Sequence, residues 1–173
     1  MKAQTKQQIA ESIRAFRLPR YEEIPTVGLD LEQVTKYIGE YLDPIQEGAL
    51  TSSMISNYVK KHLIENPVKK QYSRDQIAYL IFIAVAKNVL SLDALMNFID
   101  LQKRTYAAQR AYDYFCQQFE NLLRFTFEVT DTVDLDFDDS GVEKRLLYSC
   151  IVAVAQKLYL EKCLAAIVKE ENE

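Results

Sequence analysis

The chain has 173 residues, of which 49% are hydrophobic, with only four glycines, four prolines and a net charge of −4. This hydrophobic content excludes intrinsic disorder, and so few glycines and prolines argue against turn-rich β folds. We therefore expect an all-α protein, long enough for one buried domain or for a small head joined to a second helical unit.

The cysteines and the single histidine predict neither a disulfide framework nor a zinc site. Cys116, Cys150 and Cys163 form an odd number in no recognisable spacing, and His62 stands alone, so we expect no metal and no cofactor. The longest uncharged apolar stretch, Leu146–Gln156, is far below the ~20 residues that span a bilayer. The first 20 residues also lack the apolar core of a signal peptide. We expect a cytoplasmic protein without a membrane partner.

Basic residues are concentrated in one segment of the chain. Residues 1–99 hold 12 basic and 11 acidic side chains, whereas residues 100–173 hold 9 and 14. Between Lys60 and Asp75 there are five basic residues and two acidic ones. A small positive patch on a negative molecule suggests one face that meets an anion while the rest repels it.

The spacing of apolar residues predicts three short helices in the first third of the chain. The first covers Thr5–Phe16, and the second begins at Asp30 and ends at Asp43 and Pro44. Between them, Arg20–Gly28 reads as an extended connector. The third helix begins at an N-cap, Thr51 or Ser52, and runs to about Lys61.

A capping box marks the start of the next helix, because Ser73 is followed three residues later by Gln76. Its run IAYLIFIAVA is apolar on nearly every side, so we expect this helix in the centre of the core. Before it, Val68–Tyr72 is long enough only for a turn or a stunted strand pair, a vestigial β wing. After it, Ser91 is the expected N-cap of a short helix over Leu92–Ile99.

Two long helices are predicted in the last part, over Leu101–Phe127 and from about Gly141 to Val168. The first carries a heptad seam that suits a partner within the chain or on a second copy. As candidates for a dimer seam we name Leu101, Ala108, Tyr112, Phe115, Phe119 and Leu122. The aromatic residues of this region form either a core or a ligand cavity.

The acidic segment between the two long helices resembles the start of a calcium-binding EF-hand loop, with Asp134, Asp136 and Asp138 alternating. However, Asp139 occupies the place of the required glycine and Arg145 that of the bidentate glutamate. A capping box from Ser140 to Glu143 is the alternative explanation.

The segment SMISNYVKKHLI, Ser53–Ile64, resembles the second helix of the MerR-type winged helix-turn-helix, whose pattern runs roughly T-I-R-Y-Y-E-x-x-G-L-I. Ile55 takes the isoleucine place, and Asn57 and Tyr58 take that of the aromatic pair. The resemblance covers about Thr51–Ile99. It implies a second helix that reads bases and a wing that grips the DNA backbone.

Three departures from that pattern bear on DNA binding. Ser56 stands where MerR proteins usually place arginine, and His62 replaces a glycine that caps the helix in the left-handed conformation. The segment Asn66–Tyr72 is also too short for a full wing. With Ser56 a positive contact to DNA is missing, and with the short segment Asn66–Tyr72 the element that would hold phosphates is reduced.

A closer similarity covers most of the first hundred residues. The stretches LPRYEEIP, TSSMISNYVKKHLI, NPVKKQYSRDQIAYLI and VLSLDAL resemble a bacterial family described as a domain of unknown function with a MerR-like head. This similarity implies a fold and no particular activity.

The sequence thus predicts three parts: an N-terminal helical segment (1–19), a MerR-like helix-turn-helix head (20–99) and a C-terminal helical region for dimerisation or sensing (100–173). The predicted function is a DNA-binding transcriptional regulator, with double-stranded DNA and a second copy of the chain as partners. The residues expected to face bases are Thr51, Ser52, Ser53, Ser56, Asn57 and Lys60. Those expected to hold phosphates are Tyr58, Lys61, Lys69, Lys70 and Arg74.

The alternative is a non-catalytic protein-interaction module that retains the fold without binding DNA. A strip of cations from Lys60 to Arg74 favours DNA, whereas cations paired with Glu65 or Asp75 favour a protein partner. No glycine-rich phosphate loop, metalloprotease helix or nucleophile elbow is present in the sequence, so we do not expect an enzyme.

Overall fold

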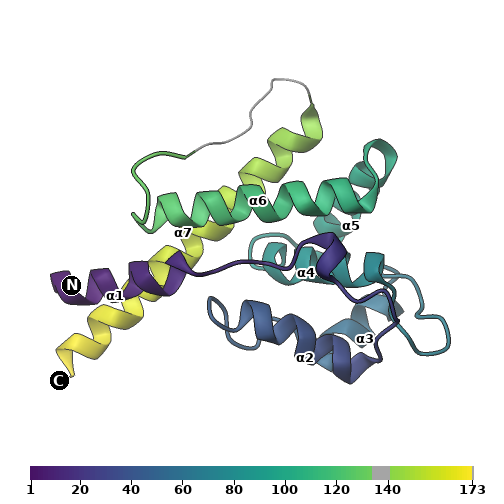
Figure 1. Cartoon of the computed structure of the whole chain (residues 1–173), viewed down its shortest axis with the longest axis horizontal. Coiled ribbons are helices and arrows are strands. Elements are labelled where there is room, and N and C mark those ends of the chain that lie inside the picture. The colour runs from purple at the N-terminus through teal and green to yellow at the C-terminus, as the bar shows by residue number, and fades with distance from the viewer. Residues whose placement is uncertain (134–140, 173) are drawn as a thin grey trace.

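The computed structural model describes residues 1–133 and 141–172, and these residues form seven α-helices and one short 3₁₀-helix (Figure 1). The predicted all-α class is confirmed. Over the described residues, β structure is limited to two isolated antiparallel bridges, Leu29–Tyr72 and Val68–Gln71. The elements are α1 (Ala3–Arg14), η1 (Tyr21–Glu23), α2 (Leu31–Leu42), α3 (Ser52–Lys60), α4 (Arg74–Ala86), α5 (Leu92–Thr105), α6 (Ala108–Thr126) and α7 (Val142–Glu171).

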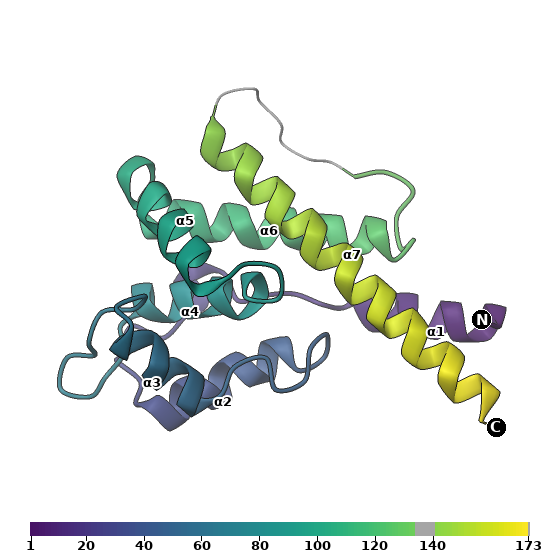
Figure 2. The ribbon, with the colours of Figure 1, turned by 180° about the vertical axis from the view of Figure 1, so that it is seen from behind.

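Helix α4 lies in the centre of the molecule, as its apolar sequence predicts. Nine of its 13 residues are buried. Helices α2 and α3 lie on one side of it and α6 and α7 on the other (Figures 1 and 2). Its first turn is fixed by the predicted capping box, in which the Ser73 hydroxyl accepts from the Gln76 amide and the Gln76 side chain accepts from the Ser73 amide.

The prediction of one continuous helix over Leu101–Phe127 is wrong. Helix α5 continues to Thr105, Tyr106 and Ala107 are extended, and α6 begins at Ala108. The joint is held by Gln102, whose amide donates to the Tyr106 carbonyl oxygen over 2.7 Å. Leu101 therefore lies on α5 and does not continue the apolar row of α6.

The residues proposed as a dimer seam belong to the core of the single chain. Tyr112, Phe115, Phe119 and Leu122 are all buried, because α6 packs against α4 and α7. The Phe115 ring stacks on Phe119 and meets Phe82 of α4 edge-on, with centroids 5.7 and 5.2 Å apart. Only Leu101 and Ala108 are half-exposed. The row is an internal packing face, which corrects the prediction.

The connector between α1 and α2, residues 15–30, is bonded to α6 over its first half. The buried Tyr112 hydroxyl donates to the Pro19 carbonyl over 2.8 Å, and the Tyr21 amide donates to Asp113 over 2.8 Å. Helix α1 packs on α6 and α7, so the two ends of the chain lie close together (Figure 1). The Lys2 amide donates to the Glu170 carboxylate.

None of the helices formed by residues 1–133 and 141–172 is long and apolar enough to cross a membrane. The EF-hand-like residues Asp134, Asp136, Asp138 and Asp139 and the proposed cap Ser140 lie outside the described residues. Within the described ranges no group of three histidine, cysteine or acidic side chains could hold a metal ion.

Candidate nucleic-acid interface

One face of helix α3 is exposed and polar. Of the two expected N-caps, Thr51 and Ser52, it is Thr51 that caps the helix, and its hydroxyl accepts from the Met54 amide over 3.2 Å. Ile55 and Tyr58 are buried, and α3 packs on α2. The opposite face presents residues at spacings of three and four, which share one side of a helix; these residues, Ser53, Ser56, Asn57 and Lys60, are all exposed.

Helix α3 ends in a left-handed cap at His62. His62 has φ 61°, a conformation that usually calls for glycine. The Tyr58 carbonyl accepts from the amides of Leu63 and Ile64, 2.9 and 3.3 Å away. Histidine thus replaces glycine here without loss of the turn. The exposed Lys61 lies at the end of the helix, where a cation complements the helix dipole.

The segment after α3 forms a minimal β-hairpin, Val68–Gln71, called the hairpin below. Its two central residues, Lys69 and Lys70, have φ 51° and 64°, and the Gln71 amide donates to the Val68 carbonyl over 2.9 Å. Two successive left-handed residues define a type I′ turn, which favours Asn-Gly. Both lysines are exposed, so the turn presents two cations at its tip.

The bridge between Leu29 and Tyr72 ties the hairpin to the connector. Their amides and carbonyls exchange two hydrogen bonds of 2.8 and 3.1 Å. Gly28 lies beside this bridge, and a Cβ atom added there would come within 2.7 Å of the Gln71 Cβ. This close approach requires glycine at position 28.

Three of the predicted contact residues do not lie on this surface. The Ser52 hydroxyl is half-buried and hydrogen-bonded to Thr35 of α2 over 3.0 Å. Tyr58 is 8% exposed, and burial raises the pKa of its hydroxyl. Neither side chain can reach DNA in this arrangement, because each is held against the rest of the chain.

Arg74 is the third of these residues, and its guanidinium faces the connector. It donates to the Ile24 carbonyl over 2.8 Å and to the Glu22 carboxylate over 3.1 Å, and it lies over the Tyr21 ring. Tyr21 in turn donates to Asp75. Arg74 therefore fastens the first turn of α4 to the connector instead of holding a phosphate.

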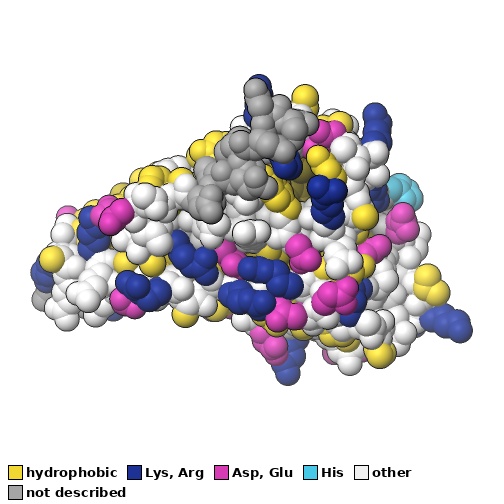
Figure 3. Space-filling model, turned by 45° about the horizontal axis from the view of Figure 1, so that its top comes forward, with side chains coloured by type: hydrophobic (Ala, Val, Ile, Leu, Met, Phe, Trp, Pro, Cys, Tyr) yellow, Lys and Arg dark blue, Asp and Glu magenta, His cyan; other side chains and the backbone are white. Residues whose placement is uncertain are grey.

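The four lysines of this region differ from Arg74 in their surroundings. Lys60, Lys61, Lys69 and Lys70 are exposed, and none of them forms a salt bridge with another described residue. By contrast, basic and acidic side chains lie next to one another over the middle of the face seen in Figure 3. The end of α3 and the hairpin thus present four exposed lysines close together in the sequence without a salt bridge to the rest of the described chain.

Sequence reasoning did not identify Lys103 as a neighbour of the hairpin. It lies in the last turn of α5, with its ammonium over the Tyr79 ring at 5.1 Å, and it lines an open groove together with Asn66, Lys69, Gln71 and Gln76. A basic residue in a last helical turn is a common helix-end signal, but the helix break after Thr105 was not predicted.

Residues 19–115 match the family named Domain of unknown function (DUF1836). The chain belongs to this family. The match begins at Pro19 and continues beyond Ile99 to Phe115 in α6, so the DUF1836 domain includes the connector from Pro19 onward, α2 to α5 and the first half of α6. No curated protein and no solved structure matches the chain.

Proposed function

We propose that the DUF1836 domain binds double-stranded DNA as a MerR-like transcriptional regulator, a binding role without catalysis. The observation that carries the proposal is the combination of an exposed polar helix face with a hairpin that presents two unpaired lysines in strained backbone conformations. Left-handed lysines are costly and persist where the surrounding structure over-determines them, which is typical of functional positions.

In this proposal α3 enters the major groove with its exposed face. Asn57 pairs bidentately with adenine and Lys60 with guanine, the pairings that their donor and acceptor geometry favours. Ser53 and Ser56 lie on the same face and Thr51 at its start. The backbone contacts come from Lys61 and from Lys69 and Lys70 at the hairpin tip.

The expected affinity of one head is small. Each neutralised phosphate contributes about −0.9 to the slope of log K against log salt, so the three lysines that contact phosphates give a slope of about −2.7 per head. A single short interface of this kind binds weakly, and a second head on the same duplex raises the affinity through its effective concentration. The proposed regulator is therefore a homodimer.

We propose that the copies pair through α7. Its outer side carries an apolar stripe whose positions repeat at spacings of four and seven and whose large members are between 42 and 65% exposed; the stripe consists of Val142, Leu146, Ala153, Leu160, Leu164 and Val168. Helix α7 crosses the outside of the molecule (Figure 2). Such a stripe suits a self-complementary helix pair related by a two-fold axis.

Fluorescence anisotropy with a pool of duplex DNA at ~50 and ~200 mM salt tests the DNA proposal. We expect binding that falls steeply with salt and is lost in Lys69→Glu/Lys70→Glu. The matched control is Lys162→Glu/Lys169→Glu, which makes the same change of net charge on α7, away from the head and from the stripe. Its binding should equal that of the wild type.

Absence of binding at low salt by a folded, dimeric protein would overturn the proposal. Equal loss in both double variants would show only a response to net charge. Absence of DNA binding would favour the protein-interaction module, because Val68 at the start of the hairpin is 75% exposed. An apolar residue in this position suits contact with a protein surface.

A further inference from the structure

The hairpin is attached to the rest of the chain on both of its sides. Tyr72, which follows it, is paired with the connector. Before it, the Glu65 carbonyl accepts from the side-chain amide of Gln76 in α4 over 2.9 Å. The same side chain accepts from the Ser73 amide over 2.8 Å. A single glutamine thus bridges the two ends of segment 65–73, which carries the hairpin.

The bond to Glu65 explains why glutamine stands at position 76. The oxygen of its side chain completes the capping box of α4 with Ser73, and a glutamate would do this equally well. The nitrogen donates to the Glu65 carbonyl, which an ionised carboxylate cannot do, because it has no hydrogen to donate. The capping box alone therefore does not require glutamine, whereas the bond to Glu65 does.

The first turn of α4 is a firm base for this bond. The buried part of the helix follows it directly, and the two residues before Gln76 are bonded to the connector. Arg74 donates to the Ile24 carbonyl over 2.8 Å, and Asp75 accepts from the Tyr21 hydroxyl. Gln76 therefore ties the hairpin to a turn that is itself held by the core and by the connector.

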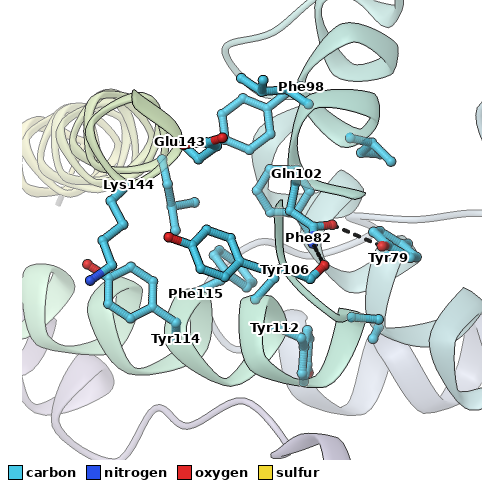
Figure 4. A pocket seen from close by; sticks show the side chains of 16 residues that line it. Tyr79, Phe82, Phe98, Gln102, Tyr106, Tyr112, Tyr114, Phe115, Glu143 and Lys144 are labelled. Carbon is cyan, nitrogen blue, oxygen red and sulfur yellow. Dashed lines mark hydrogen bonds between the residues drawn. The ribbon is translucent and has the colours of Figure 1, made fainter. Parts of the chain in front are cut away.

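Three residues further along α4, Tyr79 makes a comparable bond on the other side of the groove. Its hydroxyl donates to Gln102 over 2.9 Å, and Gln102 donates to the Tyr106 carbonyl in the joint between α5 and α6. Figure 4 shows these three side chains, which also line a small apolar pocket. Gln76 and Tyr79 both line the groove, but only Gln76 is bonded to the segment that carries the hairpin.

We propose that Gln76 is a positioning residue for DNA binding: its bond to Glu65 holds Lys69 and Lys70 in the orientation in which they meet phosphates. The two lysines form no salt bridge within residues 1–133 and 141–172, so their orientation follows from the attachment of the hairpin. A loosened hairpin spends less time in that orientation, and the apparent affinity falls in proportion. The role in DNA binding rests on the proposed function, whereas the effect of Gln76 on the hairpin does not.

Gln76→Met tests the proposal, because it removes both bonds of the side chain with little change in size and none in charge. Amide order parameters of Lys69 and Lys70, from NMR relaxation of the full chain, should fall from the value of rigid backbone, about 0.85, towards about 0.6. Anisotropy with the duplex pool at ~50 mM salt should show DNA binding weakened about two- to tenfold, the effect of one hydrogen bond.

Three further variants separate the bond to Glu65 from other effects. Gln76→Glu retains the bond to the Ser73 amide but loses that to Glu65, so it should lower the order parameters of the hairpin as Gln76→Met does. Ser73→Ala weakens the N-cap of α4 but leaves both bonds of Gln76 in place. Tyr79→Phe removes the bond on the other side of the groove. Both of these variants should retain the order of the hairpin and the DNA affinity.

Unchanged order parameters of Lys69 and Lys70 in Gln76→Met would overturn the proposal, whether or not the chain binds DNA. A loss of DNA affinity in Ser73→Ala equal to that in Gln76→Met would also overturn it, because the start of α4 would then matter and the bond to Glu65 would not. A hairpin that loosens without loss of DNA affinity would reject the role in DNA binding. If the wild-type chain binds no DNA, that role fails with the proposed function, and the order parameters still decide whether Gln76 holds the hairpin.

Discussion

Arg20 and Glu120 form a bidentate salt bridge between the connector and α6, with nitrogen–oxygen distances of 2.7 and 2.9 Å. The Glu120 side chain is only 4% exposed and also accepts from the Leu18 amide over 2.9 Å. The hydrogen bond between the Arg20 and Glu120 side chains raises the pKa of Arg20, so the guanidinium stays charged. Arg20 lies inside the DUF1836 match and Glu120 beyond its end. The pair therefore joins the family domain to the C-terminal helices.

Arg20→Ala should lower the free energy of unfolding by about 3 kcal/mol, because it leaves the buried Glu120 carboxylate with only the more distant Arg124 guanidinium, 3.9 Å away, as a cation. Urea denaturation measures this change. Arg14→Ala is the control, since Arg14 and Glu11 form a pair in which both side chains are more than half exposed, and such pairs contribute less than about 1 kcal/mol. Equal losses of unfolding free energy in Arg20→Ala and Arg14→Ala would show that the burial of Glu120 does not increase the cost of removing its partner.

Much of the fold could be predicted because helix starts are encoded locally. Thr51, Ser73 and Ser91 were expected as N-caps, and each hydroxyl accepts from the amide three residues ahead. The break at Tyr106 and Ala107 could not be predicted, because it contains neither glycine nor proline. It depends on the side chain of Gln102 and on the packing of both helices against α4, which are tertiary effects.

The candidate site was predicted only in part, for a related reason. The helical period places Ser53, Ser56, Asn57 and Lys60 on one face whatever surrounds the helix. Whether a cation is free depends on its neighbours in space, and Arg74 has partners from a segment about 50 residues earlier in the chain. The sequence contains no local signal for such a contact.

The hairpin provides a test that separates stability from DNA binding. Replacing Lys69 and Lys70 by Asn and Gly puts the favoured pair into the type I′ turn and should stabilise the fold by about 1 kcal/mol. The same variant should bind DNA more weakly because both cations are lost. Urea denaturation and anisotropy measure the two effects.

The matched variant Lys69→Gln/Lys70→Gln removes the charges but retains the free-energy cost of residues with side chains in the left-handed conformation of the turn. It should lose DNA affinity to the same extent and show no gain in stability. If Asn-Gly binds DNA as well as the wild type, the hairpin lysines do not contact phosphates. If Asn-Gly brings no stability, the left-handed turn carries no cost for lysine.

The three thiols should differ in reactivity. Burial raises the pKa of Cys116 to about 12 and that of Cys150 to about 11, so both remain protonated at pH 8, and the thiolate is the reactive form. Cys163 is half-exposed. We expect a disulfide reagent at pH 8 to modify one thiol rapidly in the folded chain and all three in urea. Cys163→Ser should remove the rapid phase; a rapid phase that persists in this variant would contradict the prediction.

The apolar stripe of α7 predicts the oligomeric state. Leu160→Glu/Leu164→Glu places two carboxylates in the centre of the proposed helix pair, where like charges from both copies would meet without solvent. Light scattering coupled to size exclusion should show a dimer for the wild type and a monomer for this variant. Because one head alone binds weakly, DNA affinity should fall as well.

The control for this prediction is Ala165→Glu/Asn172→Glu, which adds one negative charge to an exposed position of α7 and one to its exposed C-cap residue, both beside the stripe. It should remain dimeric, because neither position faces the partner helix. A wild-type chain that is monomeric at ~100 µM would reject the α7 dimer, since a dimer with a dissociation constant above ~100 µM does not hold two heads on one DNA site. A dimer that survives Leu160→Glu/Leu164→Glu would instead place the interface on another surface. The predicted α6 seam would not supply that surface, because Phe115 and Phe119 are buried within the chain.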